Sequence, residues 1–197
     1  SAPLGFVNPD AWSPDGRTLV LSQQLKDTVL DLEALPAEGG KPGILLATPN
    51  IECCSALSPD GRFLAYMSKE SGSYEIYVSP FPGPVDKRYR ISAEGGFQPL
   101  FSRDGRELFY RGLGDRPKLM SVSIESRGAF QAGTPRPLFD DTFAYQSPIS
   151  SAQYDISPDG RRFLFLEEPP AAPGPTRLVL IPDWASELRA KLRATHP

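Results

Sequence analysis

The chain is poor in the residues that build most metal centres, nucleophilic triads and disulfide scaffolds. Its 197 residues include one histidine, His196, and two cysteines, Cys53 and Cys54. A Ser-His-Asp triad is not expected on the penultimate residue, because chain ends fray, and no Gly-x-Ser-x-Gly elbow occurs. The single histidine also excludes a histidine-rich zinc site. The sequence therefore identifies no catalytic residues.

The two cysteines are adjacent in the sequence. Neighbouring residues of a strand point to opposite faces, so a disulfide between them would require a strained geometry. We therefore interpret Cys53 and Cys54 as small buried residues, with a metal or redox role as the alternative. No disulfide framework is expected to hold the protein together.

The chain also lacks a basic excess and a long apolar run. Its 21 basic and 24 acidic residues give a net charge of −3, so nucleic-acid binding has no electrostatic basis. No stretch approaches the roughly 20 apolar residues of a membrane helix, so membrane insertion by this segment is not expected. The first five residues lack the features of a signal peptide. The chain opens without methionine almost directly into a repeat, as a mature form or an excised fragment would, and its compartment stays unknown.

The sequence does contain a five-residue repeat. Three copies, at 13–17, 58–62 and 157–161, read Ser-Pro-Asp-Gly-Arg, and the copy at 102–106 has Arg103 in place of the proline. Proline presets φ, aspartate bonds to nearby backbone and glycine accepts positive φ, so each copy predicts a tight turn. An apolar, strand-prone run follows every copy. The serines are 45, 44 and 55 residues apart, and periods of about 40–45 residues are typical of β-propeller blades.

The sequence therefore predicts an all-β fold: a β-propeller of four recognisable four-stranded blades in one domain over 1–197. The blades are expected at about 10–48, 53–92, 97–139 and 152–181. In the first blade the strands are placed near 11–12, 18–22, 27–32 and 43–47. The fourth blade lacks its outer strand after 177–181, because the chain there turns into a short C-terminal α-helix over 184–194, capped by Asp183.

The repeated motif and its apolar strands resemble the TolB-like, WD-repeat-like β-propeller family of bacterial proteins. The end of the chain, from Leu178 to Trp184 and into a charged helix, is similar to the C-terminal propeller domain of bacterial serine/threonine kinases. Those domains usually carry Asn-Trp where this chain has Asp183-Trp184. No kinase signature occurs in the 197 residues. The resemblance implies a non-catalytic binding or sensing module for protein–protein interaction, from a larger bacterial protein.

Polar residues precede each motif at an equivalent position. The residues four before the motif serines are Pro9, Cys54, Gln98 and Gln153. Innermost strands line the channel of a propeller, so this level predicts a polar ring at the channel mouth. With the two nearest carboxylates, the candidate ligand-binding residues are Glu52, Cys54, Gln98, Gln153 and Asp155. The alternative is that the two glutamines only satisfy backbone groups, as the four motif aspartates are expected to do in their turns.

The alternative function is a metal-assisted hydrolase of lactones, esters or phosphoesters at the channel mouth. Calcium suits carboxylate and amide oxygens, and the resemblance to six-bladed propeller hydrolases implies a calcium in the channel. The set of ligands here is thin, so neither a cofactor nor a metal site is expected.

The number of predicted blades bears on how the propeller ring closes. Four blades fall short of the six or more that relatives of this repeat usually have. The run Leu4 to Val7 has the apolar character to supply the missing strand and close a four-bladed ring. We favour a homodimer, in which two arrays complete each other's ring. The partner protein or small ligand is not identified by the sequence.

Overall fold

The computed structural model describes residues 7–25, 29–83, 85–126, 129–143, 147–150 and 152–166. Every regular element in these ranges is a β-strand, β1 to β15, which confirms the all-β prediction for them. They contain no helix that is long and apolar enough to cross a membrane. The predicted helix 184–194 and the predicted strand 177–181 lie outside the described residues.

The first two sheets each contain four antiparallel strands in sequential order. The first sheet is formed by β1 (Val7–Trp12), β2 (Thr18–Gln23), β3 (Asp31–Pro36) and β4 (Gly43–Leu46). The second is formed by β5 (Glu52–Leu57), β6 (Phe63–Ser68), β7 (Glu75–Pro80) and β8 (Tyr89–Arg90).

The third sheet has five strands and the fourth has two within the described residues. The third contains β9 (Gly96–Phe101), β10 (Glu107–Gly112), β11 (Lys118–Glu125), β12 (Gln131–Ala132) and β13 (Arg136–Asp140). Both β12 and β13 pair with β11. The fourth contains β14 (Tyr154–Ile156) and β15 (Phe163–Phe165).

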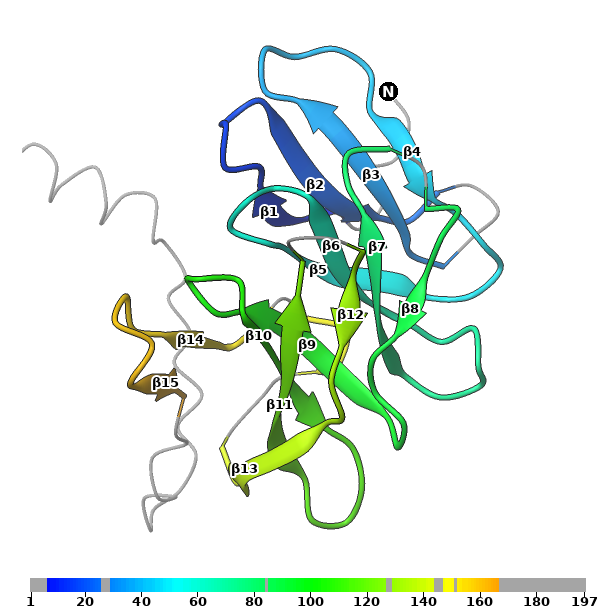
Figure 1. Cartoon of the computed structure of the whole chain (residues 1–197). Coiled ribbons are helices and arrows are strands. Elements are labelled where there is room, and N and C mark those ends of the chain that lie inside the picture. Colours follow the sequence, from blue (N-terminus) through cyan, green and yellow to red (C-terminus); the bar gives the residue numbers. More distant parts are fainter. Residues whose placement is uncertain are drawn as a thin grey trace, which may run out of the picture.

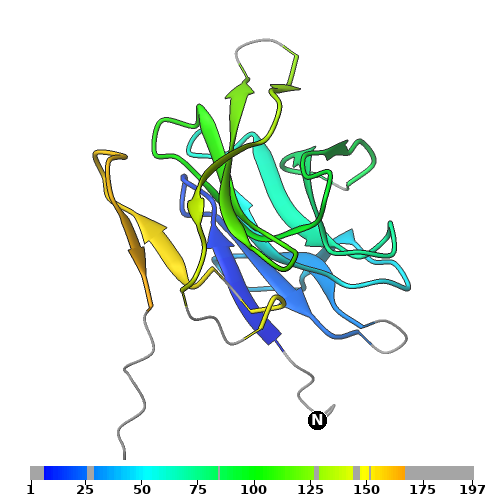
Figure 2. The same ribbon diagram turned by 90° about the horizontal axis from the view of Figure 1, so that it is seen from below.

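The sheets follow one another in space as they do in the sequence (Figures 1 and 2). The first strands of the first three sheets are neighbours, since β1 contacts β5 and β5 contacts β9. Three apolar clusters fill the spaces between consecutive sheets. Examples are Val20 against Leu64, Phe63 beside Phe130, and Phe109 against Phe163. Antiparallel sheets stacked face to face around their first strands form a propeller-like fold.

The four motif turns have the same geometry. In each copy the serine hydroxyl donates to the aspartate Oδ1 at 2.5–2.7 Å, and the same oxygen accepts the arginine backbone N–H at 3.0–3.1 Å. The motif glycines have φ between 68° and 71°, in the left-handed region that favours glycine. The serine hydrogen bond lowers the pKa of Asp15, Asp104 and Asp159 below the usual aspartate value. The turn prediction is therefore confirmed.

Two details of the first sheet differ from the prediction. Strand β1 begins at Val7, which pairs with Gln23, so Val7 belongs to the first sheet and does not complete the fourth; residues 4–6 lie outside the described ranges. Strand β3 covers 31–36 and not 27–32. The pairing of β3 with β2 extends to Pro36 because Leu32 and Ala34 pack against the second sheet. The charged residues Asp31 and Glu33 alternate with these apolar residues along the strand.

A buried ion pair fixes the segment after β13 to the third sheet. Arg111 on β10 donates to both carboxylate oxygens of Asp141, at 2.5 and 2.8 Å, and to the carbonyl oxygen of Phe143 at 2.7 Å. Its guanidinium lies 5.7 Å from the ring centroids of Phe97 and Phe165. One side chain thus joins β9, β10, β15 and the chain between β13 and β14.

Candidate functional site

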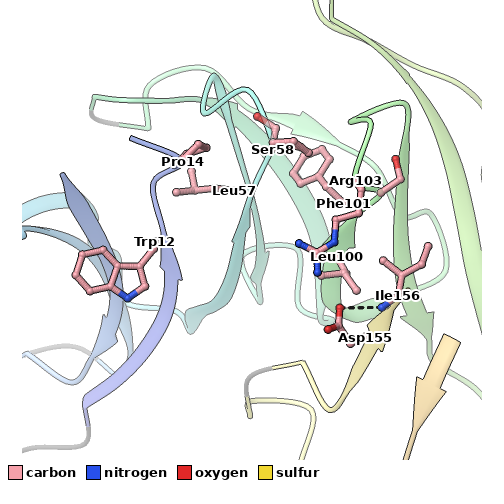
Figure 3. A pocket seen from close by; sticks show the side chains of 11 residues that line it. Trp12, Pro14, Leu57, Ser58, Leu100, Phe101, Arg103, Asp155 and Ile156 are labelled. Carbon is pink, nitrogen blue, oxygen red and sulfur yellow. Dashed lines mark hydrogen bonds between the residues drawn. The ribbon is translucent and has the colours of Figure 1, made fainter. Parts of the chain in front are cut away.

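A pocket of about 450 Å³ opens where the first strands of the four sheets run into their motif turns. Figure 3 shows Trp12 on one side of this pocket and Arg103, Leu100 and Asp155 on the other. We call it the turn-end pocket; its lining residues are Trp12, Pro14, Leu57, Ser58, Pro59, Leu100, Phe101, Ser102, Arg103, Asp155 and Ile156. Apolar walls with a few polar groups are typical of ligand sites.

The motif prolines contact the motif glycine of the next sheet. A β-carbon built on Gly61 would lie 3.1 Å from Cδ of Pro14, and one built on Gly105 would lie 3.4 Å from Cδ of Pro59. The third copy has Arg103 in the place of this proline, and a β-carbon on Gly160 would meet no described atom within 4 Å. A second pocket, of about 510 Å³, occupies the space between the third and fourth turns and is also lined by Arg103. The departure from the repeat therefore coincides with an opening.

The charged groups of the turn-end pocket are available to a ligand. Arg103 is exposed, and no hydrogen bond or ion pair joins its guanidinium to another described residue. Asp155 is also exposed; one carboxylate oxygen accepts the backbone N–H of Ile156 at 2.8 Å. Trp12 is 58% exposed. Within the part of the chain that the structure describes, the pocket thus combines a cation without an ion-pair partner, a carboxylate and an accessible indole ring.

In the first three sheets, the residue four positions before the motif serine lies at a β-bulge. Cys54 and Gln98 are the only non-glycine residues with positive φ in the described part of the chain, at 60° and 53°, and the strand register shifts beside each of them. Asp10 from the first sheet supports the bulge of the second. Its Oδ2 accepts the N–H of Ser55 at 3.0 Å and the hydroxyl of Ser22 at 2.5 Å. Burial raises the pKa of Asp10.

The bulges bring three predicted site residues to one place, where the protein's own segment 147–150 lies against them. The Gln98 side-chain nitrogen donates to the Ser150 hydroxyl at 3.0 Å, and its Oε1 accepts the backbone N–H of Gln153 at 3.4 Å. The Cys54 sulfur lies 3.7 Å from the carbonyl oxygen of Pro148. Cys54 and Gln98 are buried, and a role for them in ligand binding remains a prediction. The contact of Gln98 with the backbone N–H of Gln153 agrees with the alternative, in which the glutamine satisfies backbone groups.

The left-handed turn at Cys54 changes the geometry of the cysteine pair. Both cysteines are free and buried, as predicted. Their sulfurs are 2.8 Å apart, so the expectation of side chains on opposite faces is wrong, because regular alternation ends at the bulge. The hydrogen bond with Cys53 and burial raise the pKa of the Cys54 thiol, which makes it a poor nucleophile.

Glu52 lies away from the turn-end pocket and is fully buried. Its Oε1 accepts the hydroxyls of Thr48 at 2.7 Å and Ser68 at 3.1 Å. Its Oε2 has no hydrogen-bond partner among the described residues. Burial is the largest influence on this carboxyl and raises its pKa.

Replacing Glu52 with glutamine should therefore stabilise the fold more at pH 7 than at pH 4. The folded pKa is raised, so wild type loses stability as the pH rises from the ordinary value of 4.5 through the folded value, whereas glutamine stays neutral. Urea unfolding of both proteins at the two pH values measures the difference. Glu94→Gln, which removes an exposed carboxylate, is the control. An equal effect of Glu52→Gln at both pH values would contradict the assignment.

Of the five predicted site residues, Asp155 alone lines the turn-end pocket. Trp12 and Arg103 were missed as site residues, although the sequence carried a signal for one of them: Arg103 is the single departure from the repeated motif. No group of three or more His, Cys, Asp or Glu side chains in the described residues is arranged to hold a metal ion.

The comparisons with known proteins agree with the fold. No family model matches the chain. The uncharacterised protein Atu1656 of Agrobacterium fabrum is 26% identical over 159 residues, covering 79% of this chain and 53% of that protein. The structure of a putative TolB from Agrobacterium tumefaciens matches with a TM-score of 0.60 and 21% identity, over 81% of this chain and 59% of the other.

Two further similar structures are of proteins named as enzymes. A putative 6-phosphogluconolactonase from Bacteroides uniformis matches with a TM-score of 0.53 and 16% identity, over 81% of this chain and 46% of the other. An oligogalacturonate lyase in complex with manganese matches with a TM-score of 0.56 and 13% identity, over 82% of this chain and 44% of the other. These likenesses support a TolB-like propeller fold. The chain spans about half the length of the proteins it matches.

Proposed function

We propose that this chain is a non-catalytic β-propeller module for binding or sensing, part of a larger bacterial protein, and that its ligand is a peptide segment of a protein partner. The turn-end pocket is the binding site. Arg103 receives an acidic side chain of the peptide, and Trp12 and Leu57 contact a neighbouring apolar side chain.

One observation carries this proposal: the residue that breaks the repeat, Arg103, is a cation of the pocket that has no ion-pair partner among the described residues. In two other copies the equivalent proline packs on the next turn, which is a structural role. Arg103 leaves that contact unmade, and its guanidinium points to no described partner. Arginine offers planar, bidentate recognition of carboxylates, so a carboxylate-bearing ligand fits it.

The remaining groups of the pocket favour a binding role over metal chemistry. Asp155 is the single carboxylate of the lining, and the hydroxyls of Ser58 and Ser102 in the same lining donate to Asp60 and Asp104 of their own turns. Calcium takes six to eight oxygen ligands, and this donor set does not fit that requirement. Asp155 instead suits a polar or basic group of the same peptide, which adds selectivity through charge placement.

Arg103→Pro, which restores the repeat consensus, is expected to weaken binding of an acidic peptide by about 10–100-fold. The estimate assumes that a hydrogen bond to a charged group contributes about 1.5–3 kcal/mol. The probe is a fluorescein-labelled peptide of alternating glutamate and leucine, followed by fluorescence anisotropy. Matched peptides with serine or lysine in place of glutamate are the ligand controls.

Arg103→Pro also serves as its own folding control. Proline occupies the equivalent turn position in three copies, so the variant should be as stable as wild type or more stable by up to about 1 kcal/mol. Unchanged peptide binding by a folded Arg103→Pro protein would overturn the site. Turnover of a chromogenic lactone, ester or phosphoester that is lost on chelation would overturn the non-catalytic proposal in favour of the hydrolase.

A further inference from the structure

A pocket of about 420 Å³ lies at the end of the third sheet that is opposite to its motif turn. Gly112, at the end of β10, and Lys118, at the start of β11, both line it. It shares no described lining residue with the turn-end pocket, and strand β10 between them has six residues, which span about 20 Å. We call it the far-end pocket; its lining includes Glu94, Tyr110, Leu113, Arg116, Lys118 and Met120.

Apolar side chains form the walls of the far-end pocket. Tyr110, Leu113 and Met120 belong to, or pack against, the apolar cluster between the second and third sheets. Two glycines allow the walls this position. A β-carbon on Gly95 would lie 2.8 Å from Cδ1 of Leu113, and one on Gly96 would lie 2.6 Å from Cδ2 of Tyr110. A larger residue at either position would displace the walls, so the pocket is built into the packing of the core.

The hydroxyl of Tyr110 is a polar group without a partner in these apolar surroundings. Tyr110 is 2% exposed, and within the described ranges its hydroxyl makes no hydrogen bond. Burial raises the pKa of Tyr110 to about 12, so the group is protonated at neutral pH and can both donate and accept. Buried polar groups are nearly always hydrogen-bonded. A hydroxyl in the lining that lacks a partner therefore indicates a polar atom of a ligand.

The pocket also has two available charges of opposite sign. The charged residues of its lining are Glu94, Arg116 and Lys118. The ammonium group of Lys118 already pairs with Asp140, at 2.7 Å. Arg116 and Glu94 are exposed, and neither forms an ion pair with any residue that the structure describes. A cation and a carboxylate beside an apolar cavity are complementary to a zwitterion with an apolar body.

We infer that the far-end pocket binds a free α-amino acid with an aromatic side chain that carries a hydroxyl, as tyrosine does. Arg116 binds its carboxylate through charge-assisted hydrogen bonds, and Glu94 binds its ammonium group. The ring lies against Leu113 and Met120, since aromatic rings make favourable contacts with methionine sulfur, and its hydroxyl bonds to that of Tyr110. An internal residue of a peptide has neither backbone charge, so the two charges favour the free amino acid.

Ligands that each lack one group test this inference. L-Tyrosine is titrated into the isotope-labelled chain, and the amide signals of Gly95 and Gly112 are followed by nuclear magnetic resonance. These signals should shift and saturate with a Kd of about 1 mM or below, which is ordinary for a ligand of this size. L-Phenylalanine lacks the hydroxyl, tyramine lacks the carboxylate and hydroxyphenylpropanoate lacks the ammonium group. Each should bind about three- to tenfold more weakly than L-tyrosine.

Three variants assign each contact to its residue. Tyr110→Phe should bind L-tyrosine and L-phenylalanine equally. Arg116→Gln should no longer distinguish L-tyrosine from tyramine, and Glu94→Gln should no longer distinguish it from hydroxyphenylpropanoate. A purely structural role of these side chains would not remove one preference at a time. Arg17→Gln, which removes an exposed arginine of the first turn, is the matched control and should bind as wild type does.

Three results would overturn the inference. The first is that the signals of Gly95 and Gly112 stay in place throughout the titration with L-tyrosine. The second is that wild type binds all four ligands with equal affinity. The third is that L-tyrosine shifts the signals of Trp12 and Arg103 and leaves those of the two glycines unmoved, which would assign the amino acid to the turn-end pocket.

Discussion

Replacing Arg111 with methionine should lower the free energy of unfolding by about 3–5 kcal/mol, the usual cost of removing one partner of a buried ion pair. The side chains of Arg111 and Asp141 are 0% and 1% exposed. The variant leaves the Asp141 carboxylate buried without its counter-charge. It also removes the cation that lies against Phe97 and Phe165. Urea unfolding at constant pH and ionic strength measures the loss.

Two further variants separate the buried charge from general loss of packing. Arg111→Met/Asp141→Leu removes both charges and should recover most of the stability, because a buried pair replaced by apolar groups is often nearly neutral. Arg136→Met breaks the ion pair with Glu107. The side chains of Arg136 and Glu107 are 63% and 34% exposed, so the variant should lose less than about 1 kcal/mol of unfolding free energy. A single Arg111 variant as stable as the Arg136 variant would contradict the role assigned to this pair.

Gly61→Val is expected to destabilise the fold more than Gly160→Val. Both glycines have φ near 70°, so valine costs about 1–3 kcal/mol in backbone strain at either position. At Gly61 the new β-carbon also lies 3.1 Å from Cδ of Pro14, and such overpacking costs about 1–3 kcal/mol more. Gly160 has no such neighbour among the described residues.

The difference between the two unfolding free energies isolates the proline–glycine contact. Pro14→Ala should remove most of the additional cost of Gly61→Val, because the ring atoms Cγ and Cδ that the new β-carbon meets are gone. Equal costs at the two glycines would show that the contact between turns has no energetic role. An unchanged midpoint for Gly160→Val would contradict the turn geometry itself.

The repeat made most of the fold predictable. The chemistry of Ser58, Asp60 and Gly61 determines a local turn through short-range hydrogen bonds, so the same structure forms in all four copies. The strands on either side then follow from alternation of apolar residues. The end of β3 was harder, because the sequence predicted that this strand ends at residue 32, whereas it continues through the buried Glu33 to Pro36. The number of blades and the closure of the ring depend on contacts between sheets, which no local sequence pattern encodes.

The candidate site was less predictable because two local features decide it. Nothing in cysteine or glutamine favours positive φ, yet Cys54 and Gln98 adopt it, and the resulting bulges turn these side chains toward segment 147–150. The arginine at position 103 was visible as a departure from the repeat. The structural consequence was not visible in the sequence: Pro14 and Pro59 pack on the next turn, and Arg103 leaves the corresponding space open.

The indole N–H signal of Trp12 in a nuclear magnetic resonance spectrum is the most direct test of the proposed binding site. The chain has two tryptophans, and Trp12→Phe identifies the signal of Trp12. Addition of the glutamate–leucine peptide should shift this signal in wild type and leave it unmoved in Arg103→Pro. A Trp12 signal that stays in place while the amide signals of Cys54 and Gln98 shift would contradict the account and place the binding site at the bulges.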